Sequence, residues 1–196
     1  MSVKESFTLE KAKEIIDYAL TEFYLHDKAL VQYPRIKEAV SENCMLFRIG
    51  WYIHEYVKRD GNFALLSVDC QYNRNFEHPK SMYKQTLSGI NKKVKDPIPD
   101  LLFHQRGSND NNLFLVELKK GKPGKSELLN DDEKLRYFTT ESAEYKYAYG
   151  FSIWLYKKAW AKVKVYVDGK ERCHLNYEWK AKPIKGGDNH EVYNSR

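Results

Sequence analysis

Length, composition and charge restrict what this protein can be. Its 196 residues suit a single domain, because domains commonly contain about 100–200 residues. Three cysteines without a CxxC pair indicate neither a disulfide framework nor a zinc site. No run approaches the roughly 18 apolar residues that cross a membrane, and the polar N-terminus does not resemble a signal peptide. We therefore expect a soluble, cytoplasmic protein, whose net charge of +6 favours a polyanionic partner.

The first two predicted elements are helices. Apolar residues recur at helical spacing over residues 8–24, and Thr8 can cap that helix. Residues 27–35 form a connection. A second helix is predicted over residues 36–59, with an apolar stripe that is broad enough to be buried, and Asp60 with the following glycine ends it.

The apolar pattern then changes to a period of two, which is typical of strands. Three strands are expected, over residues 63–72, 100–105 and 113–119. The third should be central, because it is apolar on both faces until its end. Between the first two strands lies a polar, basic stretch, residues 73–97, which we predict to be a long functional loop. Turn-forming residues at 107–112 predict a hairpin between the second and third strands.

The last third of the chain returns to helix and then strand. A helix is predicted from about Asn130, because asparagine caps helices well and three acidic residues follow it. A fourth strand is expected over residues 147–156. Residues 163–167 and 172–177 should form a β-hairpin around an Asp-Gly turn. From residue 181 onward we expect a flexible, polar tail.

The order of these elements predicts the fold class. A helix that follows one strand and leads into another implies a crossover, so we expect a mixed α/β (α+β) domain. Its central mixed sheet should carry helices on both faces. One domain is expected over residues 1–180, with a helical extension at 1–35, a core at 36–156 and a β-hairpin at 157–180. Residues 181–196 lie outside it.

Three residues at one end of the predicted sheet can carry chemistry. Strand alternation places Glu117 and Lys119 on the same face of the third strand. A hairpin between the second and third strands would place Asp100 beside Glu117. Two close carboxylates repel each other unless a positive charge lies between them, and Mg²⁺ prefers oxygen ligands. These three residues therefore predict a metal site beside a lysine that can orient a water.

The residues Pro99-Asp100 and Glu117-Leu118-Lys119, together with the element order over residues 42–156, resemble the PD-(D/E)xK nuclease superfamily. That superfamily has the restriction-endonuclease-like fold. The resemblance implies a Mg²⁺-dependent or Mn²⁺-dependent nuclease, with DNA favoured over RNA as the partner. It also implies that Asp100, Glu117 and Leu118 bind the metal, while Lys119 positions or activates the attacking water.

Other residues are expected around this site. The resemblance implies an assisting glutamate on the helix before the first strand, and Glu42 fits that place. Asp69 is either a further ligand or partner of a ligand, or a residue that caps a strand end. Lys134 either reaches a phosphate or is an ordinary charge at a helix start. A basic run between residues 80 and 125 supplies the lysines expected to bind nucleic acid: Lys92, Lys93, Lys95, Lys120 and Lys122.

Other interpretations stay open at this point. Asp100 could be a turn residue after proline, with Glu117 and Lys119 forming a plain cross-strand ion pair. A protein with a nuclease-like fold can also bind nucleic acid or a protein partner without cutting. A third reading is a structural or interaction module. A homodimer is compatible with the sequence, since many nucleases of that fold dimerise to cut two strands.

Overall fold

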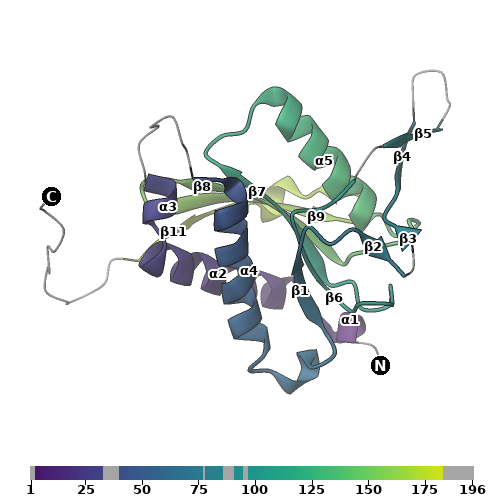
Figure 1. The fold of residues 1–196 in the computed structure, drawn as a ribbon, viewed down its shortest axis with the longest axis horizontal. Helices are drawn as coiled ribbons and strands as arrows, with labels where there is room; N and C mark the ends of the chain where they lie inside the picture. Colours follow the sequence, from purple (N-terminus) through teal and green to yellow (C-terminus); the bar gives the residue numbers. More distant parts are fainter. Residues whose placement is uncertain (1–2, 33–39, 77, 86–90, 95–96, 183–196) are drawn as a thin grey trace, which may run out of the picture.

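The computed structural model describes residues 3–32, 40–76, 78–85, 91–94 and 97–182. In this part the chain forms a mixed α+β fold, in which a central sheet has helices on both faces (Figure 1). This confirms the expected mixed sheet with flanking helices. None of the described helices has the length and apolar character needed to cross a membrane.

The N-terminal helices form one layer. The helices α2 (Leu9–His26) and α4 (Glu42–Val57) pack against each other and against the sheet. The α2 helix begins as expected, because the Thr8 hydroxyl accepts a hydrogen bond from the Lys11 N–H at 3.2 Å. Ser41 caps α4 in the same manner, and residues 36–39 of the predicted helix lie outside the described residues. Two short helices, α1 (Val3–Ser6) and α3 (Ala29–Gln32), flank α2.

Seven strands of the described part form the central sheet. In chain order they are β1 (Ser67–Cys70), β6 (Leu101–His104), β7 (Phe114–Lys120), β8 (Tyr149–Tyr156), β9 (Trp160–Val167), β10 (Lys170–Glu171) and β11 (Tyr177–Lys180). The spatial order is β1-β6-β7-β8-β9-β10, and β11 also pairs with β9. Only β7 and β8 among these pairs are parallel, and α5 (Lys125–Thr139) makes the crossover between them.

Alternation along the strands divides the core between the two faces of the sheet. Val116 and Leu118 of β7 are buried with α2 and α4 in the larger cluster. Leu115 of β7 points the other way and is buried with Leu135 and Phe138 of α5. We call this second side the α5 face. A register slip of one residue would exchange the two sets of side chains, so burial on both faces fixes the register.

Two predicted elements before the site differ in the structure. The first strand begins at Ser67, because residues 61–63 form a 3₁₀ helix, η1 (Gly61–Phe63), capped by Asp60. The segment 73–97 is not a plain loop. It contains two small antiparallel pairs, β2 (Arg74–Asn75) with β3 (His78–Pro79) and β4 (Met82–Gln85) with β5 (Asn91–Val94). Polar and basic composition concealed these strands, since it carries no apolar alternation.

The later elements also differ in their bounds. The α5 helix begins at Lys125 instead of near Asn130, because the Glu127 carboxylate accepts from the Gly124 N–H at 2.8 Å and caps the earlier start. The Asp-Gly turn joins β9 to β10 with positive φ at both residues, as a tight hairpin needs. A 3₁₀ helix, η2 (Cys173–Leu175), then leads to β11, which pairs with the first half of β9. Residues 183–196 lie outside the described part.

Candidate functional site

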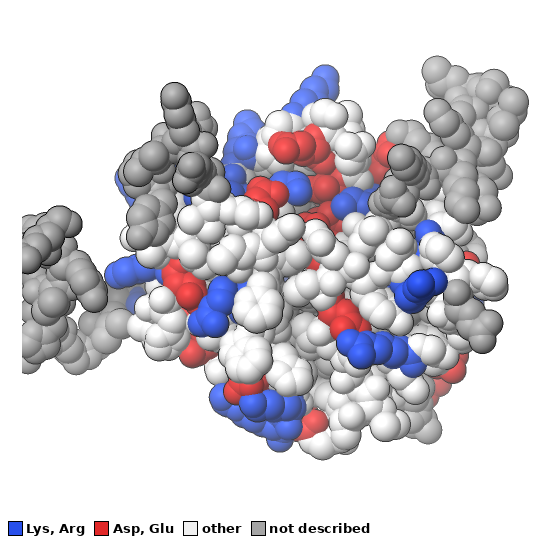
Figure 2. Space-filling view, viewed as in Figure 1, with Lys and Arg blue, Asp and Glu red and all other residues white. Residues whose placement is uncertain are grey.

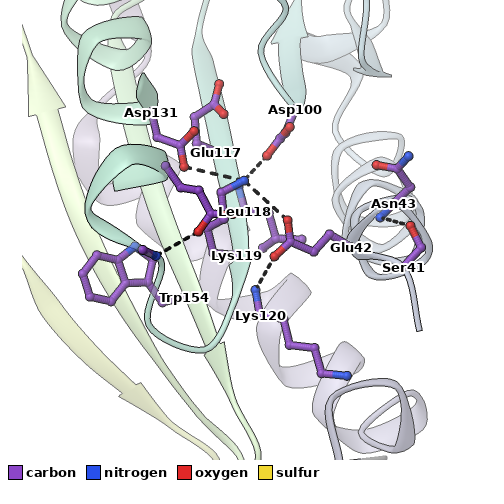
Figure 3. A network of polar contacts seen from close by, with 12 residues as sticks. Ser41, Glu42, Asn43, Asp100, Glu117, Leu118, Lys119, Lys120, Asp131 and Trp154 are labelled. Atoms are coloured by element: carbon purple, nitrogen blue, oxygen red, sulfur yellow. Dashed lines mark hydrogen bonds and ion pairs between the residues drawn. The ribbon is translucent and has the colours of Figure 1, made fainter. Parts of the chain in front are cut away.

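The candidate site lies where β7 continues beyond the start of β6. The β6 strand begins at Leu101, while β7 runs on to Lys120, so side chains replace the neighbouring strand there. The Asp100 carboxylate accepts from the Leu118 N–H at 2.8 Å, and the Glu42 carboxylate accepts from the Lys120 N–H at 2.9 Å (Figure 3). Two carboxylates therefore accept hydrogen bonds from the part of the β7 edge that β6 does not cover.

A backbone oxygen faces the same edge. The N–H and C=O of one strand residue point to the same side, so the Leu118 carbonyl lies on the side where Asp100 and Glu42 bind. A hollow of about 20 Å³ is present there, lined by Glu42, Asn43, Leu46, Asp100 and Leu118. A space of this size holds about one water molecule. The edge thus presents oxygen atoms from two carboxylates and one carbonyl around a small space.

Lys119 lies on the α5 face, where alternation places it. Its ammonium group is 3.4 Å from the Glu42 carboxylate and 3.6 Å from the Asp131 carboxylate, and its side chain is 15% exposed. Burial disfavours the charged form, but the surrounding carboxylates, Asp131 foremost, raise the pKa of Lys119 above its ordinary value. The network therefore favours the charged form of Lys119.

Glu117 is fully buried on the same face. Its Oε2 accepts from the ammonium group of Lys134, whereas its Oε1 is buried without a hydrogen-bond partner in the described structure. Burial, reinforced by the nearby Asp100, raises the pKa of Glu117 well above its ordinary value even though Lys134 opposes this. A buried carboxylate oxygen without a partner is costly, so this group favours a proton or a cation.

The α5 helix contributes Asp131 and Lys134 to this network, and these two residues lie about one helical turn apart. The Lys134 ammonium group is 3.7 Å from the Asp131 carboxylate and 3.5 Å from the carbonyl oxygen of Ile98. Burial raises the pKa of Asp131, although Lys119 and Lys134 oppose the rise. Figure 2 shows acidic and basic groups gathered in the upper middle of the view, between α5 and α4.

The charges of this network do not balance. Four carboxylates, those of Glu42, Asp100, Glu117 and Asp131, surround the ammonium groups of Lys119 and Lys134. Two negative charges are left over when all six groups are ionised. A buried excess of this kind is relieved either by protonation or by binding a cation.

The supporting residues predicted from the sequence divide between two places. Glu42 and Lys134 reach the site, but Lys134 pairs with Glu117 and Asp131 instead of projecting toward solvent. Asp69 does not belong to it. Both oxygens of the Asp69 carboxylate are bound by Arg106, and one also contacts His104 at 3.0 Å, at the other end of β6. Of the two roles expected for Asp69, its pairing with Arg106 and His104 favours a structural one over metal binding.

The lysines expected to contact nucleic acid are also divided. Lys120 turns away from the α5 face, and its ammonium group donates to the Leu30 carbonyl at 3.0 Å. Lys122 is exposed in the turn after β7. Lys92 and Lys93 lie on β5, where the structure describes the backbone but not the side chains, and Lys95 lies outside the described residues.

Sequence reasoning did not place Asp131 in the site. Its contact with Lys119 depends on how α5 packs over β7, which no local pattern reveals. The available signal was its spacing of three residues from Lys134, which puts both on one face of the helix. Among the described residues, no three His, Cys, Asp or Glu side chains are grouped as a ready-made metal cage. Any metal here would need water ligands.

The fold and the site define a mixed α+β protein with an acidic, lysine-containing centre at the end of a central strand. No protein-family model, curated protein or solved structure matches this chain. The likeness to the PD-(D/E)xK nucleases therefore depends on the residues and the order of the elements alone.

Proposed function

We propose that this protein is a Mg²⁺-dependent phosphodiesterase that cuts nucleic acid. The observation that carries the proposal is the gathering of four carboxylates around Lys119 and Lys134, which leaves an excess of two negative charges when all six groups are ionised. A divalent cation would balance that excess. Carboxylate and carbonyl oxygens are the ligands that Mg²⁺ prefers, and Mn²⁺ accepts the same donors.

The residues present fit such an ion. Asp100, the Leu118 carbonyl and the unpartnered oxygen of Glu117 would hold it, and Glu42 would accept from its waters. Mg²⁺ usually takes only one or two protein carboxylates and keeps several waters, so a cage of three acidic residues is unnecessary. The ion would supply Lewis acidity toward a phosphate oxygen.

The chain's own groups would perform the remaining tasks. Lys119, held between Glu42 and Asp131, would orient the attacking water and stabilise the charge that develops on the phosphate. Lys134 would partly neutralise Glu117 from the opposite side. The order Asp, Glu-x-Lys on adjacent strands is the pattern of the PD-(D/E)xK nucleases, which supports phosphoryl chemistry and favours DNA as the substrate. Cutting both strands of a duplex would need two copies of the single site.

A second candidate function has its own support. Glu117 is completely buried and already paired with Lys134, which resembles a structural ion pair more than an open ligand. A nuclease-like protein that binds nucleic acid or a protein partner without cutting would show this arrangement. In either function we place the protein in the cytoplasm, in keeping with its three free cysteines.

The deciding experiment is a cleavage time course on single-stranded and double-stranded DNA and RNA, with Mg²⁺, Mn²⁺ or EDTA. We expect cleavage only with a metal. Asp100→Asn should remove it, because this substitution takes away the carboxylate at the β7 edge. The matched control is Asp110→Asn, in an exposed turn away from the site. Binding without cleavage under every metal would select the second function.

A further inference from the structure

A second surface continues from the candidate site across the α5 face of the sheet. Lys119 on β7 is in register with Trp154 on β8, and Trp154 is in register with Lys162 on β9. Two residues before Lys162 on β9, Trp160 is in register with Lys180 on β11. Alternation puts these side chains on the α5 face, because the intervening residues of β8 and β9 are buried with α2 and α4. We call the following residues the sheet platform: Trp154, Tyr156, Trp160, Lys162, Lys164 and Lys180.

The aromatic residues of the platform are held by stacking. The rings of Tyr156 and Trp160 are parallel, with centroids 3.9 Å apart, and both side chains are partly exposed. Trp154 is buried beneath the ammonium groups of Lys162 and Lys164, which lie 5.2 Å and 5.7 Å from its ring centroid. Cations over a tryptophan ring are attracted to it and kept in place. The platform therefore combines a stacked aromatic pair, Tyr156 and Trp160, with lysines that are held over a tryptophan ring.

An open groove of about 500 Å³ lies beside the registered pair Trp160 and Lys180. It is lined by Lys158, Ala159, Trp160, Glu178, Lys180 and Ala181. Its lining thus includes one aromatic residue, Trp160, and two lysines, Lys158 and Lys180. A groove that contains an aromatic ring and lysines suits unpaired nucleotides, because bases stack on the ring while phosphates contact the cations.

The charge of the platform is opposite to that of the candidate site. Lys164 pairs with Glu171 at 3.1 Å and Lys180 pairs with Glu178 at 3.3 Å. Lys162 of the platform and Lys158 of the adjoining groove add two positive charges beyond these pairs. A polyanion would therefore be attracted to the platform, while the neighbouring site attracts cations.

We propose that the sheet platform binds single-stranded nucleic acid and directs it toward the candidate site. The binding step follows from the platform alone, and the direction of the strand toward Lys119 rests on the proposed function. A single strand suits this surface better than a duplex, because only unpaired bases can stack on the Tyr156–Trp160 pair. The platform is missed by sequence reasoning because its residues are spread over three strands, β8, β9 and β11.

The test is fluorescence anisotropy of the full chain with a labelled thymidine strand of about 12 nucleotides, a length within the usual site sizes. EDTA prevents cleavage. Parallel arms use a uridine strand, the duplex and an abasic strand with the same number of phosphates. We expect Trp160→Ala to weaken thymidine-strand binding about tenfold and to leave abasic-strand binding nearly unchanged. Trp160→Phe should retain most of the affinity, which separates stacking from loss of fold.

Lys162→Ala should weaken binding to every strand and lower the salt dependence by about one counterion. The matched control is Trp51→Ala, a tryptophan that is 47% exposed on α4, which should bind as the wild type does. Wild-type binding by Trp160→Ala and Lys162→Ala, or equal affinity of the wild type for the abasic strand, would overturn the platform and leave the cleavage proposal standing. Loss of binding in both variants without cleavage by the wild type would support the platform and overturn the proposed function.

Discussion

Two clusters of charged side chains lie on the α5 face, one at each end of β6, and they differ in how their carboxylates are balanced. At the end near His104, the Asp69 carboxylate is bound by Arg106 at 2.8 Å and by His104 at 3.0 Å. Burial alone would raise the pKa of Asp69, but these two partners hold it well below its ordinary range. Asp69 is therefore a satisfied anion in the folded protein.

At the other end of β6, near Asp100, the pKa of the buried carboxyl group is raised instead of lowered. Glu117 accepts from Lys134, lies close to the Asp131 carboxyl group and has one buried oxygen without a hydrogen-bond partner, and burial raises its pKa. The comparison shows that a buried carboxylate is not in itself a sign of chemistry. An excess of negative charge that the protein leaves unbalanced is the informative feature, because structural clusters are normally satisfied from within. This contrast can be tested at four points.

The largest expected effect concerns Lys119 at the unbalanced cluster. Lys119→Ala should lower the cleavage rate about 10²–10⁴-fold, because a group that positions or transfers a proton contributes that much. Affinity for nucleic acid should stay nearly intact, since Lys119 is 15% exposed and engaged by carboxylates. The measurement is a single-turnover cleavage time course beside an anisotropy titration.

Lys170→Ala is the control for Lys119→Ala, because Lys170 is exposed on β10 and has no expected role in the site or in nucleic-acid binding. Excess Mg²⁺ or Mn²⁺ should not restore Lys119→Ala, since that substitution does not remove a metal ligand. A variant that cuts at the wild-type rate would show that the excess charge near Lys119 has no catalytic role.

The unbalanced cluster could be predicted in part from the sequence. Asp100, Glu117 and Lys119 are local to one hairpin, and alternation with the pairing of Leu101 and Val116 is enough to bring them together. Asp131 could not be found in this way, because its position depends on the packing of α5 over the sheet. The chemistry that the three predicted residues perform stays a proposal.

The balanced cluster and the small strands show a different limit. Alternation placed Asp69 on the correct face, but its partner Arg106 is 37 residues away and lies beyond the next strand. Sequence spacing gives no information on such a pair. In the segment 73–97, β4 and β5 pair through backbone groups in a polar sequence, so no apolar period indicated them. The central strand β7, apolar on both faces, was the most predictable element.

The second effect concerns the balanced cluster. Arg106→Ala should lower the free energy of unfolding by about 1–3 kcal/mol, because it leaves the buried Asp69 carboxylate with fewer donors. Cleavage per folded molecule should not change. The measurement is urea denaturation, with the exposed Lys170→Ala as control. A loss of cleavage in fully folded Arg106→Ala would mean that both clusters serve one site.

The third effect concerns competition between a proton and a metal at Glu117. Because its pKa is raised, Mg²⁺ must displace a proton, so affinity for Mg²⁺ should increase with pH by up to about tenfold per unit. Calorimetric titration at a series of pH values measures this. Asp100→Asn should bind Mg²⁺ weakly at every pH. An affinity that does not depend on pH would exclude Glu117 from the metal site.

The smallest effect concerns stability without metal. Glu117→Gln should raise the free energy of unfolding by about 1 kcal/mol near neutral pH, because a neutral amide avoids ionisation of a fully buried carboxyl group. Lys134 loses its ion pair with Glu117 but keeps contacts with Asp131 and the Ile98 carbonyl. Cleavage should nevertheless be lost.

The sign of the pH dependence distinguishes this explanation for Glu117→Gln from a general packing effect. The folded-state pKa of Glu117 is raised, so its contribution to wild-type stability is complete below the unfolded value of about 4.3 and is lost as pH rises through the folded pKa. The variant has no such loss, so the difference between the two proteins should be smallest in acid and should grow toward neutral pH. Urea denaturation in EDTA over this range measures it, with the exposed Glu10→Gln as control. A difference that is constant with pH would show that folding does not shift the pKa of Glu117, and a difference that shrinks toward neutral pH would show that Glu117 is a satisfied anion like Asp69; either result would contradict the contrast between the two ends of β6.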